Sequence, residues 1–271
     1  MASTSVTPTA KNSLESPNPG LNISFQTARL SFKPLCLTDT PALHELRTES
    51  EVMKWSVQKV PDASLQQTED WIRAWVSTDT YPSTSGSDPE YEGEGVVKSN
   101  QSNKNRTKSK QKGLCFSVRE LAHIQSSEKE EGPRQDRIVA TVGIKEAESP
   151  ITKRLQYELG YMFVPRVWGK GYASEAVKGI VRWWFEYLDS FYTLDSDYSK
   201  VSGGDGGEGD VAEKDRIYAI VSKTNGASLR VLEKCGFRVV GEGREDDGTG
   251  DGLELVEFCI SRSDLTRWRT G

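Results

Sequence analysis

The sequence predicts an α+β fold in which helices accompany a mostly antiparallel sheet. Strand-like apolar runs occur at residues 113–121, 137–147 and 155–164. Polar segments join these runs, which is typical of an antiparallel meander. A long helical stripe follows the third run, and a strand and a shorter helix come later in the chain. We therefore expect helices that pack on one sheet.

Composition and charge narrow the functional classes. The chain has 271 residues, of which 35% are hydrophobic and 28% are charged, so we expect a core diluted by polar insertions. The net charge of -5 argues against a nucleic-acid-binding protein, because such proteins need a basic face. No segment approaches the roughly 20 apolar residues of a membrane-spanning helix, so we expect no membrane association.

The cysteines and histidines predict no metal site. Residues 1–22 lack the apolar core of a signal peptide and are rich in Ser, Thr and Pro, so they are predicted to form a disordered tail. We expect a cytoplasmic or nuclear protein with reduced thiols, because the cysteines are far apart and have no CxxC spacing. The cysteines are Cys36, Cys115, Cys235 and Cys259, and the two histidines are His44 and His123.

Ordered structure is predicted to begin near residue 23. Alternating apolar positions in 23–35 indicate a strand. The next segment, 38–55, is predicted to be a helix that Thr38 or Asp39 can cap. A second helix is expected over 64–78, and its apolar positions are Trp71, Ile72, Trp75 and Val76.

Two polar segments interrupt this pattern and are predicted to be solvated insertions. Residues 81–112 are acidic and Gly/Pro-rich at first and then carry six basic residues in 98–112, for which a nuclear-import or anion-binding patch is the alternative. Residues 189–215 hold eight acidic and two basic side chains, but their spacing does not fit a calcium-binding EF-hand loop. Since the insertions account for the excess length, we expect a single domain over 23–271.

The elements after the meander alternate between helix and strand. A helix is predicted to begin near Tyr172, and we expect Trp183 and Trp184 to pack in the core. A strand over 216–222 and a helix over 226–235 follow, and the last two strands are expected at 237–242 and 253–261. The apolar stripe of the long helix comprises Ala173, Ala176, Val177, Ile180, Val181, Trp184 and Leu188.

The junction "RVWGKGYASEA" (166–176) lies between a strand and a helix and predicts an anion-binding loop. It is not a P-loop, because Gly171 follows Lys170 where Ser or Thr is required. A dinucleotide fingerprint is disfavoured, since Ser174 occupies the third glycine position. The pattern R/Q-x-x-G-x-G/A fits Arg166, Gly169 and Gly171, and in it successive amides surround a pyrophosphate at the start of a helix.

A second motif, "NGASLRVLEKCGF" (225–237), follows later, with Asn225 at the start of a helix and Gly236 at its end. Together the two motifs resemble the GNAT superfamily of acyl-CoA-dependent N-acyltransferases. The resemblance is stronger to the RimJ/RimL-type branch, which contains ribosomal-protein N-terminal acetyltransferases. It covers residues 27–76 and 137–260, with "TARLSFKPLCLTDTPALHELRTESEVMKW" similar to the branch's first strand and helix.

The resemblance implies a fold and an activity. The implied fold is α+β, a three-layer α/β/α sandwich around a mixed, mostly antiparallel central sheet. The implied activity transfers an acetyl group from acetyl-CoA, without a metal, to a primary amine such as a protein or peptide N-terminus. A catalytically silent acyl-CoA-binding or sensing module is the alternative. The partners would be acetyl-CoA and the amine acceptor, and the protein would be a monomer or a homodimer.

The resemblance also implies cofactor-binding residues. The backbone of 162–164 would pair with the pantetheine amides, and the amides of 167–171 would hold the pyrophosphate, with Arg166 or Lys170 adding positive charge. Asn225 and Ser228 would bind the CoA arm, although capping of the 226–235 helix is an alternative role for both. The full set is Met162, Phe163, Val164, Arg166, Val167, Trp168, Gly169, Lys170, Gly171, Asn225 and Ser228.

Glu158 is the expected catalytic base, because strand periodicity places it on the face of Met162 and Val164 and several family members carry their base at this position. The span of about 13 Å from 158 to 162 would require a relayed water, and an ion-paired strand glutamate is the alternative. The amides of Phe163 and Val164 would stabilise the oxyanion.

The proton donor to the thiolate is left open. Leu232 stands where many family members have a tyrosine, so Tyr161 and Tyr218 are the substitutes considered, and the thiolate can also leave without one. Cys235 has no histidine nearby to activate it and is expected to be a structural thiol.

Overall fold

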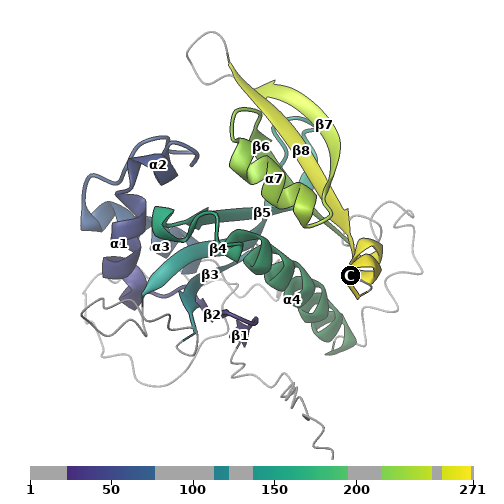
Figure 1. Cartoon of the computed structure of the whole chain (residues 1–271), viewed down its shortest axis with the longest axis horizontal. Helices are drawn as coiled ribbons and strands as arrows, with labels where there is room; N and C mark the ends of the chain where they lie inside the picture. The colour runs from purple at the N-terminus through teal and green to yellow at the C-terminus, as the bar shows by residue number, and fades with distance from the viewer. Residues whose placement is uncertain (1–22, 77–112, 122–136, 195–214, 246–251, 270–271) are drawn as a thin grey trace, which may run out of the picture.

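The computed structural model describes residues 23–76, 113–121, 137–194, 215–245 and 252–269 (Figure 1). The predicted tail at 1–22 and the predicted insertion at 81–112 lie outside the described residues. So does most of the second predicted insertion, although 189–194 belongs to a helix and Asp215 is described.

The described strands form one eight-stranded sheet in the order β1-β2-β3-β4-β5-β6-β8-β7. All neighbouring pairs are antiparallel except β5 and β6, so the predicted mixed, mostly antiparallel sheet is confirmed. The strands are β1 (Phe25–Gln26), β2 (Leu30–Pro34), β3 (Gly113–Glu120), β4 (Ile138–Glu148), β5 (Leu155–Phe163), β6 (Arg216–Ser222), β7 (Arg238–Glu245) and β8 (Leu253–Ser261).

The single parallel pair also has the fewest paired residues of any two neighbouring strands in the described sheet. β5 pairs with β4 over nine residues, but its pairing with β6 is limited to Glu158 and Tyr218. A parallel pair needs a crossover connection, and α4 (Tyr172–Leu194) supplies it between the two strands. Beyond residue 158 the two strands diverge, and this divergence opens the middle of the sheet.

The other helices differ in part from the predicted ones. They are η1 (Leu37–Asp39), α1 (Thr40–Arg47), α2 (Ser50–Met53), α3 (Leu65–Val76), η4 (Pro165–Val167), α7 (Gly226–Lys234) and η5 (Arg262–Arg269). The predicted 38–55 helix is therefore interrupted after Arg47, where Thr48 Oγ1 bonds the carbonyls of His44 and Glu45. Side-chain bonds of this kind compete with the helical pattern.

Asp39 stands at the N-cap position of α1, but its side chain makes no capping bond. The carboxylate instead pairs with Arg119 of β3 at 2.6 Å and accepts a bond from the backbone N–H of Cys36 at 3.2 Å. Asp39 therefore does not cap α1 as predicted, but through Cys36 it closes a capping box at the start of η1, just before that helix.

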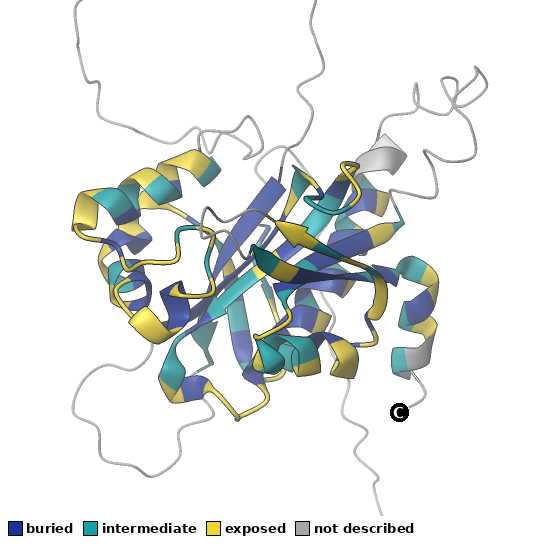
Figure 2. Ribbon diagram, turned by 90° about the horizontal axis from the view of Figure 1, so that it is seen from above, coloured by how far each residue is buried: buried dark blue, intermediate teal, exposed yellow. Residues whose placement is uncertain are grey.

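Two buried clusters give the fold three layers. On one face of the sheet, α4 and α7 pack against the strands, and the predicted α4 stripe is buried from Ala176 to Leu188. On the other face, α1 and α3 pack through Leu43, Leu46 and Ile72. Each such side chain contributes about 1.5–3 kcal/mol on full burial. Figure 2 shows the buried residues concentrated where helices meet the strands, as the predicted α/β/α sandwich requires.

The core also uses aromatic side chains of α4. Trp184 is almost fully buried, and Trp183 stacks on Phe25 with ring centroids 5.4 Å apart. Both tryptophans pack as predicted. Within the described residues, no helix is both long enough and apolar enough to cross a membrane.

Candidate functional site

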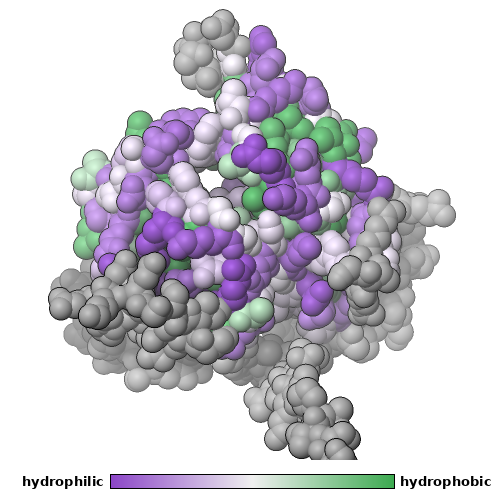
Figure 3. All heavy atoms as spheres, viewed as in Figure 1, coloured by the Kyte–Doolittle hydropathy of each residue, from purple (hydrophilic) through white to green (hydrophobic). Residues whose placement is uncertain are grey.

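A cleft of about 1230 Å³ passes through the sheet where β5 and β6 diverge. Its walls include Gly160, Met162 and Phe163 of β5 and Ile220 and Ser222 of β6. Figure 3 shows a hollow near the middle of the face seen in Figure 1, surrounded mainly by hydrophilic residues. The cleft therefore joins the α4–α7 side of the sheet to the α1–α3 side.

The glycine loop forms one end of the cleft, at the start of the 23-residue helix α4. Gly169 and Gly171 have φ values of 75° and 80°, a left-handed conformation that favours glycine. Among the described residues, no acceptor is found for the amides of these two glycines, whereas Trp168 and Lys170 donate to carbonyls within the loop. Free amides beside the positive end of a helix dipole make an anion-binding site.

A clamp from the edge of the sheet holds this loop, and the sequence did not reveal it. Arg29, before β2, pairs with Glu175 of α4 at 2.6 Å and donates to the carbonyl of Lys170 at 3.0 Å. Its guanidinium also lies 4.3 Å from the ring centre of Tyr172. Burial tends to raise the pKa of Glu175, but hydrogen bonds from Thr27 and Arg29 outweigh it and lower that pKa below its usual value.

The predicted loop residues have different surroundings. Gly169, Gly171 and Val167 line the cleft, and so does Trp168, whose indole donates to the Phe163 carbonyl at 2.8 Å. Arg166 is directed elsewhere, since its guanidinium donates to the carbonyl of Ile138 at 3.4 Å. Neither Arg166 nor Lys170 is among the described cleft residues, so the loop would attract an anion through its backbone amides. Arg230 and Lys234 of α7 supply positive charge elsewhere on the wall.

The backbone of β5 presents alternate residues to the cleft. Val164 donates its amide to the carbonyl of Val139 at 2.9 Å. Because antiparallel pairs alternate, the amide of Met162 also faces β4, whereas those of Tyr161 and Phe163 face the gap toward β6. The expected oxyanion donor at Val164 is therefore wrong, because its amide is already used within the sheet. The predicted pairing of the Val164 backbone with a pantetheine amide is wrong as well, since its carbonyl accepts from Val167 at 3.2 Å. Of the three predicted residues, Phe163 keeps an amide on the open side.

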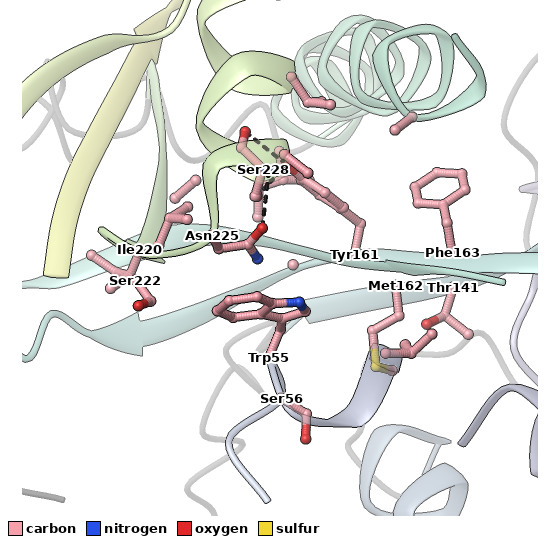
Figure 4. Close-up of a pocket in the computed structure, with 18 of the residues that line it drawn as sticks. Trp55, Ser56, Thr141, Tyr161, Met162, Phe163, Ile220, Ser222, Asn225 and Ser228 are labelled. Carbon is pink, nitrogen blue, oxygen red and sulfur yellow. Dashed lines mark hydrogen bonds between the residues drawn. The ribbon is translucent and has the colours of Figure 1, made fainter. Parts of the chain in front are cut away.

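Asn225 and Ser228 lie together at the start of α7, on the wall of the cleft (Figure 4). The Asn225 side chain accepts from the Ser228 amide at 3.1 Å, so it caps the helix. The hydroxyl of Ser228 lies 2.7 Å from that of Tyr161, which projects from β5. Burial raises the pKa of Tyr161 well above its usual value, so this hydroxyl stays neutral and can donate a hydrogen bond.

The remaining candidates for proton transfer are placed less favourably. Leu232 is fully buried in the core, and Tyr218 is buried and is absent from the described cleft wall. Cys235 is buried against α4, with its thiol donating to the carbonyl of Ser174 at 3.4 Å. Burial raises the pKa of Cys235 to about 11, which fits the predicted structural thiol.

Glu158 lies on the α1–α3 side of the cleft, where it shares a face with Gly160 and Met162 and stands opposite Lys145 of β4. Burial raises the pKa of Glu158, the carboxylates of Glu257 and Glu245 raise it further, and Lys145 opposes them. A carboxylate with a raised pKa accepts protons more readily than an exposed one, which is the property of a general base.

Three tryptophans line the cleft on the same side as Glu158. Trp55 follows α2 and is 40% exposed, and its ring lies below β5 near Met162 (Figure 4). Trp71 and Trp75 of α3 complete this wall. The sequence placed the α3 pair on an apolar stripe but gave no indication that it borders a cleft, because that depends on how α3 meets the sheet.

A buried ion pair fixes the segment that carries Trp55. Arg47 of α1 pairs with Asp62 at 2.6 Å, and Thr68 of α3 donates to the same carboxylate. Burial tends to raise the pKa of Asp62, but the bonds from Arg47, Thr68 and Gln58 outweigh it and lower that pKa. No group of three His, Cys, Asp or Glu side chains in the described ranges is placed to hold a metal ion.

The sequence matches the family model of the acetyltransferase (GNAT) domain over residues 29–238. This match spans the glycine loop, Glu158 and the start of α7. A search of curated protein sequences gives no match.

Solved structures with the same fold have low sequence identity to the chain. A GNAT-family acetyltransferase from Bacillus anthracis superposes with a TM-score of 0.53 at 18% identity, covering 88% of this chain and 98% of that one. The ribosomal-protein-S5-alanine acetyltransferase of Vibrio fischeri gives 0.52 at 14% identity, with 89% and 97% covered. Spermidine N-acetyltransferase from Vibrio cholerae, in complex with CoA and spermine, gives 0.51 at 14% identity, with 88% and 98% covered. These likenesses show the fold.

Proposed function

The chain belongs to the GNAT acetyltransferase family, and on this premise we propose that it transfers an acetyl group from acetyl-CoA to a primary amine, such as a peptide N-terminus. The observation that carries the proposal is the cleft through the sheet. It has an anion-binding glycine loop at one end and the carboxylate of Glu158 on the opposite side. An acyl donor and an acceptor can thus approach each other from opposite faces.

The described residues fit acetyl-CoA as the cosubstrate. The free amides of Gly169 and Gly171 would hold the pyrophosphate, and the open side of β5 would pair with the pantetheine arm. Asn225 and Ser228 would border the same arm at the start of α7. The solved structure of the Vibrio cholerae enzyme contains CoA, which supports this choice of cosubstrate.

The chemistry requires three groups, and each has a candidate. Glu158 would accept a proton from the attacking amine, through a water where the distance requires one. The Phe163 amide would donate to the oxyanion of the tetrahedral intermediate. Tyr161 and Ser228 form a hydrogen-bonded pair in which one hydroxyl donates to the other. When the carbon–sulfur bond breaks, the remaining O–H of this pair would donate to the departing thiolate, which later takes a proton from solvent.

The comparisons leave the acceptor open, because two proteins with this fold act on a polyamine and on a ribosomal protein. Three further points remain predictions. They are membership of the RimJ/RimL-type branch, a single domain over 23–271, and a cytoplasmic or nuclear location.

The experiment that tests the function is an amine-panel assay. The full chain is mixed with acetyl-CoA and with peptides or small amines, free thiol is followed over time, and acetylated products are identified by mass spectrometry. We expect amine-dependent release of CoA. CoA binding without turnover on any amine would favour the silent acyl-CoA-binding module, and a failure to bind CoA would contradict both functions.

A further inference from the structure

The acceptor side of the cleft contains a glycine that its backbone does not require. Gly160 lies in the middle of β5, has no left-handed φ, and a Cβ added there would meet no atom within 4 Å. Its partner across the sheet, Gly143, is different, because a Cβ there would come within 2.8 Å of the Leu114 carbonyl. Packing therefore explains Gly143 but leaves Gly160 unexplained.

The absence of a side chain at 160 costs stability and creates space. Glycine inside a strand is roughly 0.5–1 kcal/mol less favourable than alanine. In return, a stretch of bare backbone is exposed to the cleft between Glu158 and Met162, which share its face of β5. A slender group can lie directly on the sheet at this point.

The opposite wall of this space is aromatic. Trp55, Trp71 and Trp75 line the same side of the cleft, and the Trp71 and Trp75 rings meet edge-on with centroids 6.2 Å apart. The Arg47 guanidinium lies 4.4 Å from the ring centre of Trp71 and fixes that ring. Figure 4 places the Trp55 ring below β5, so an indole and the bare backbone at Gly160 line the same side of the cleft, and such a slot favours an apolar group over a charged one.

The charges around the slot do not suit a polycation. Glu51 is paired with Lys54 at 2.5 Å, and Glu158 stands opposite Lys145. Lys59 adds another positive charge to the cleft wall. A polyamine needs several uncompensated carboxylates along its length, whereas a single amine needs one acceptor for its proton. The other carboxylates of the cleft wall are Glu148 and Glu245, and its other cations are Arg230 and Lys234. Among the described residues, five cations therefore stand against four carboxylates around the cleft, a balance that disfavours a polycation.

We propose that the slot between Gly160 and Trp55 binds the apolar group of a monoamine acceptor and thereby determines specificity. The amine would then lie toward Glu158, two residues along the same face and roughly 7 Å away. This inference rests on the proposed function and defines its substrate class as a primary amine with one positive charge and an adjacent apolar group. A small monoamine or the apolar N-terminal residue of a peptide can supply that chemistry.

The wild-type chain is tested first, with acetyl-CoA and five acceptors: methylamine, phenethylamine, spermidine and the tripeptides Phe-Gly-Gly and Gly-Gly-Gly. We expect kcat/KM for phenethylamine or Phe-Gly-Gly to exceed that for methylamine, Gly-Gly-Gly and spermidine by about tenfold or more, since an apolar group is buried. A higher kcat/KM for phenethylamine would identify a small monoamine as the acceptor, and a higher kcat/KM for Phe-Gly-Gly would identify a peptide N-terminus. A preference for spermidine, or no preference, would overturn the inference while leaving the acetyltransferase activity established.

Variants of the slot then separate specificity from folding. Gly160→Ala and Gly160→Val should progressively lower kcat/KM for the apolar acceptor. In Gly160→Val we expect this kcat/KM to fall tenfold or more, while kcat/KM for methylamine falls less than twofold. CoA affinity should not change, and Gly160→Ala should unfold at the wild-type temperature or above it. Trp55→Ala should show the same selectivity. Leu155→Ala is the control, because it removes an exposed apolar side chain of β5 that lies outside the cleft wall. It should leave kcat/KM unchanged for all acceptors.

Equal losses for apolar and small acceptors would show that Gly160 serves the fold, and would overturn the assignment. If Gly160→Val loses CoA binding, Trp55→Ala decides the question, because Trp55 lies below β5 and across the sheet from Ser228 and Tyr161 (Figure 4). Unchanged acceptor preference in Trp55→Ala would also contradict the slot.

Discussion

At the scale of single residues, the chemistry depends on how the cleft alters Glu158. This carboxyl group is half-buried, faces the carboxylates of Glu257 and Glu245, and is opposed by Lys145 across the β4–β5 pairing. A base works only when ionised, so a raised pKa means that activity should fall as pH decreases through a value above 4.5. The two kinds of neighbour can be separated by mutation.

We predict that Glu158→Gln lowers kcat by about 10²–10⁴-fold. Lys145→Met removes a cation that lowers the Glu158 pKa, so the acid limb of the kcat profile should move to higher pH. Glu245→Gln should move it to lower pH. The measurement is kcat against pH for the three variants with saturating acetyl-CoA. An acid limb that stays fixed in both neighbour variants would mean that Glu158 is not the titrating base.

The sequence identified the residue types of the catalytic strand but not all of their partners. Period-2 alternation correctly placed Glu158 and Met162 on one face. The same reasoning could not show that the Val164 amide donates to the Val139 carbonyl, because pairing register depends on the neighbouring strand. The bond between Tyr161 and Ser228 joins residues 67 positions apart and was equally inaccessible.

At the scale of elements, the glycine loop is held by the edge of the sheet as well as by its own helix. Arg29 contacts Glu175, the Lys170 carbonyl and the Tyr172 ring, and so connects the start of β2 with the start of α4. These contacts span at least 141 residues, which is why a local pattern found the loop but missed its support.

We predict that Arg29→Ala raises KM for acetyl-CoA by about tenfold and leaves kcat within twofold, because it loosens the loop without touching the reacting atoms. Arg73→Ala is the matched control, since it removes another arginine–glutamate pair, with Glu69, on the surface of α3. Steady-state kinetics in both substrates checks the prediction. A loss confined to kcat would assign Arg29 a different role.

The boundaries of elements were predicted less well than their existence. The α1–α2 break coincides with the side-chain bonds of Thr48 and with an extended Glu49 (ψ 110°), neither of which helix propensity reveals. The polar composition of 189–215 indicated a loop, yet α4 continues to Leu194. Composition averaged over 189–215 was therefore misleading for its first six residues, which belong to the helix.

At the scale of the whole molecule, one topological feature produces the site. β5 and β6 are parallel in an otherwise antiparallel sheet, and they pair at a single position before they separate. The sequence pattern predicted an antiparallel meander, and resemblance to a family supplied the mixed sheet and the three-layer arrangement. The acceptor side arises where α2 and α3 meet the sheet, and no local pattern encodes that packing.

The central claim is that the glycine loop holds the pyrophosphate of CoA, and calorimetric titration of CoA into glycine variants tests it most directly. Gly169 and Gly236 have similar φ values of 75° and 82°, but only the first of this pair lines the cleft. Gly169→Ala and Gly236→Ala should therefore lose comparable stability through backbone strain. We predict 1:1 binding to the wild-type chain, a dissociation constant raised about tenfold or more in Gly169→Ala, and no change in Gly236→Ala. Wild-type affinity in Gly169→Ala would contradict the account.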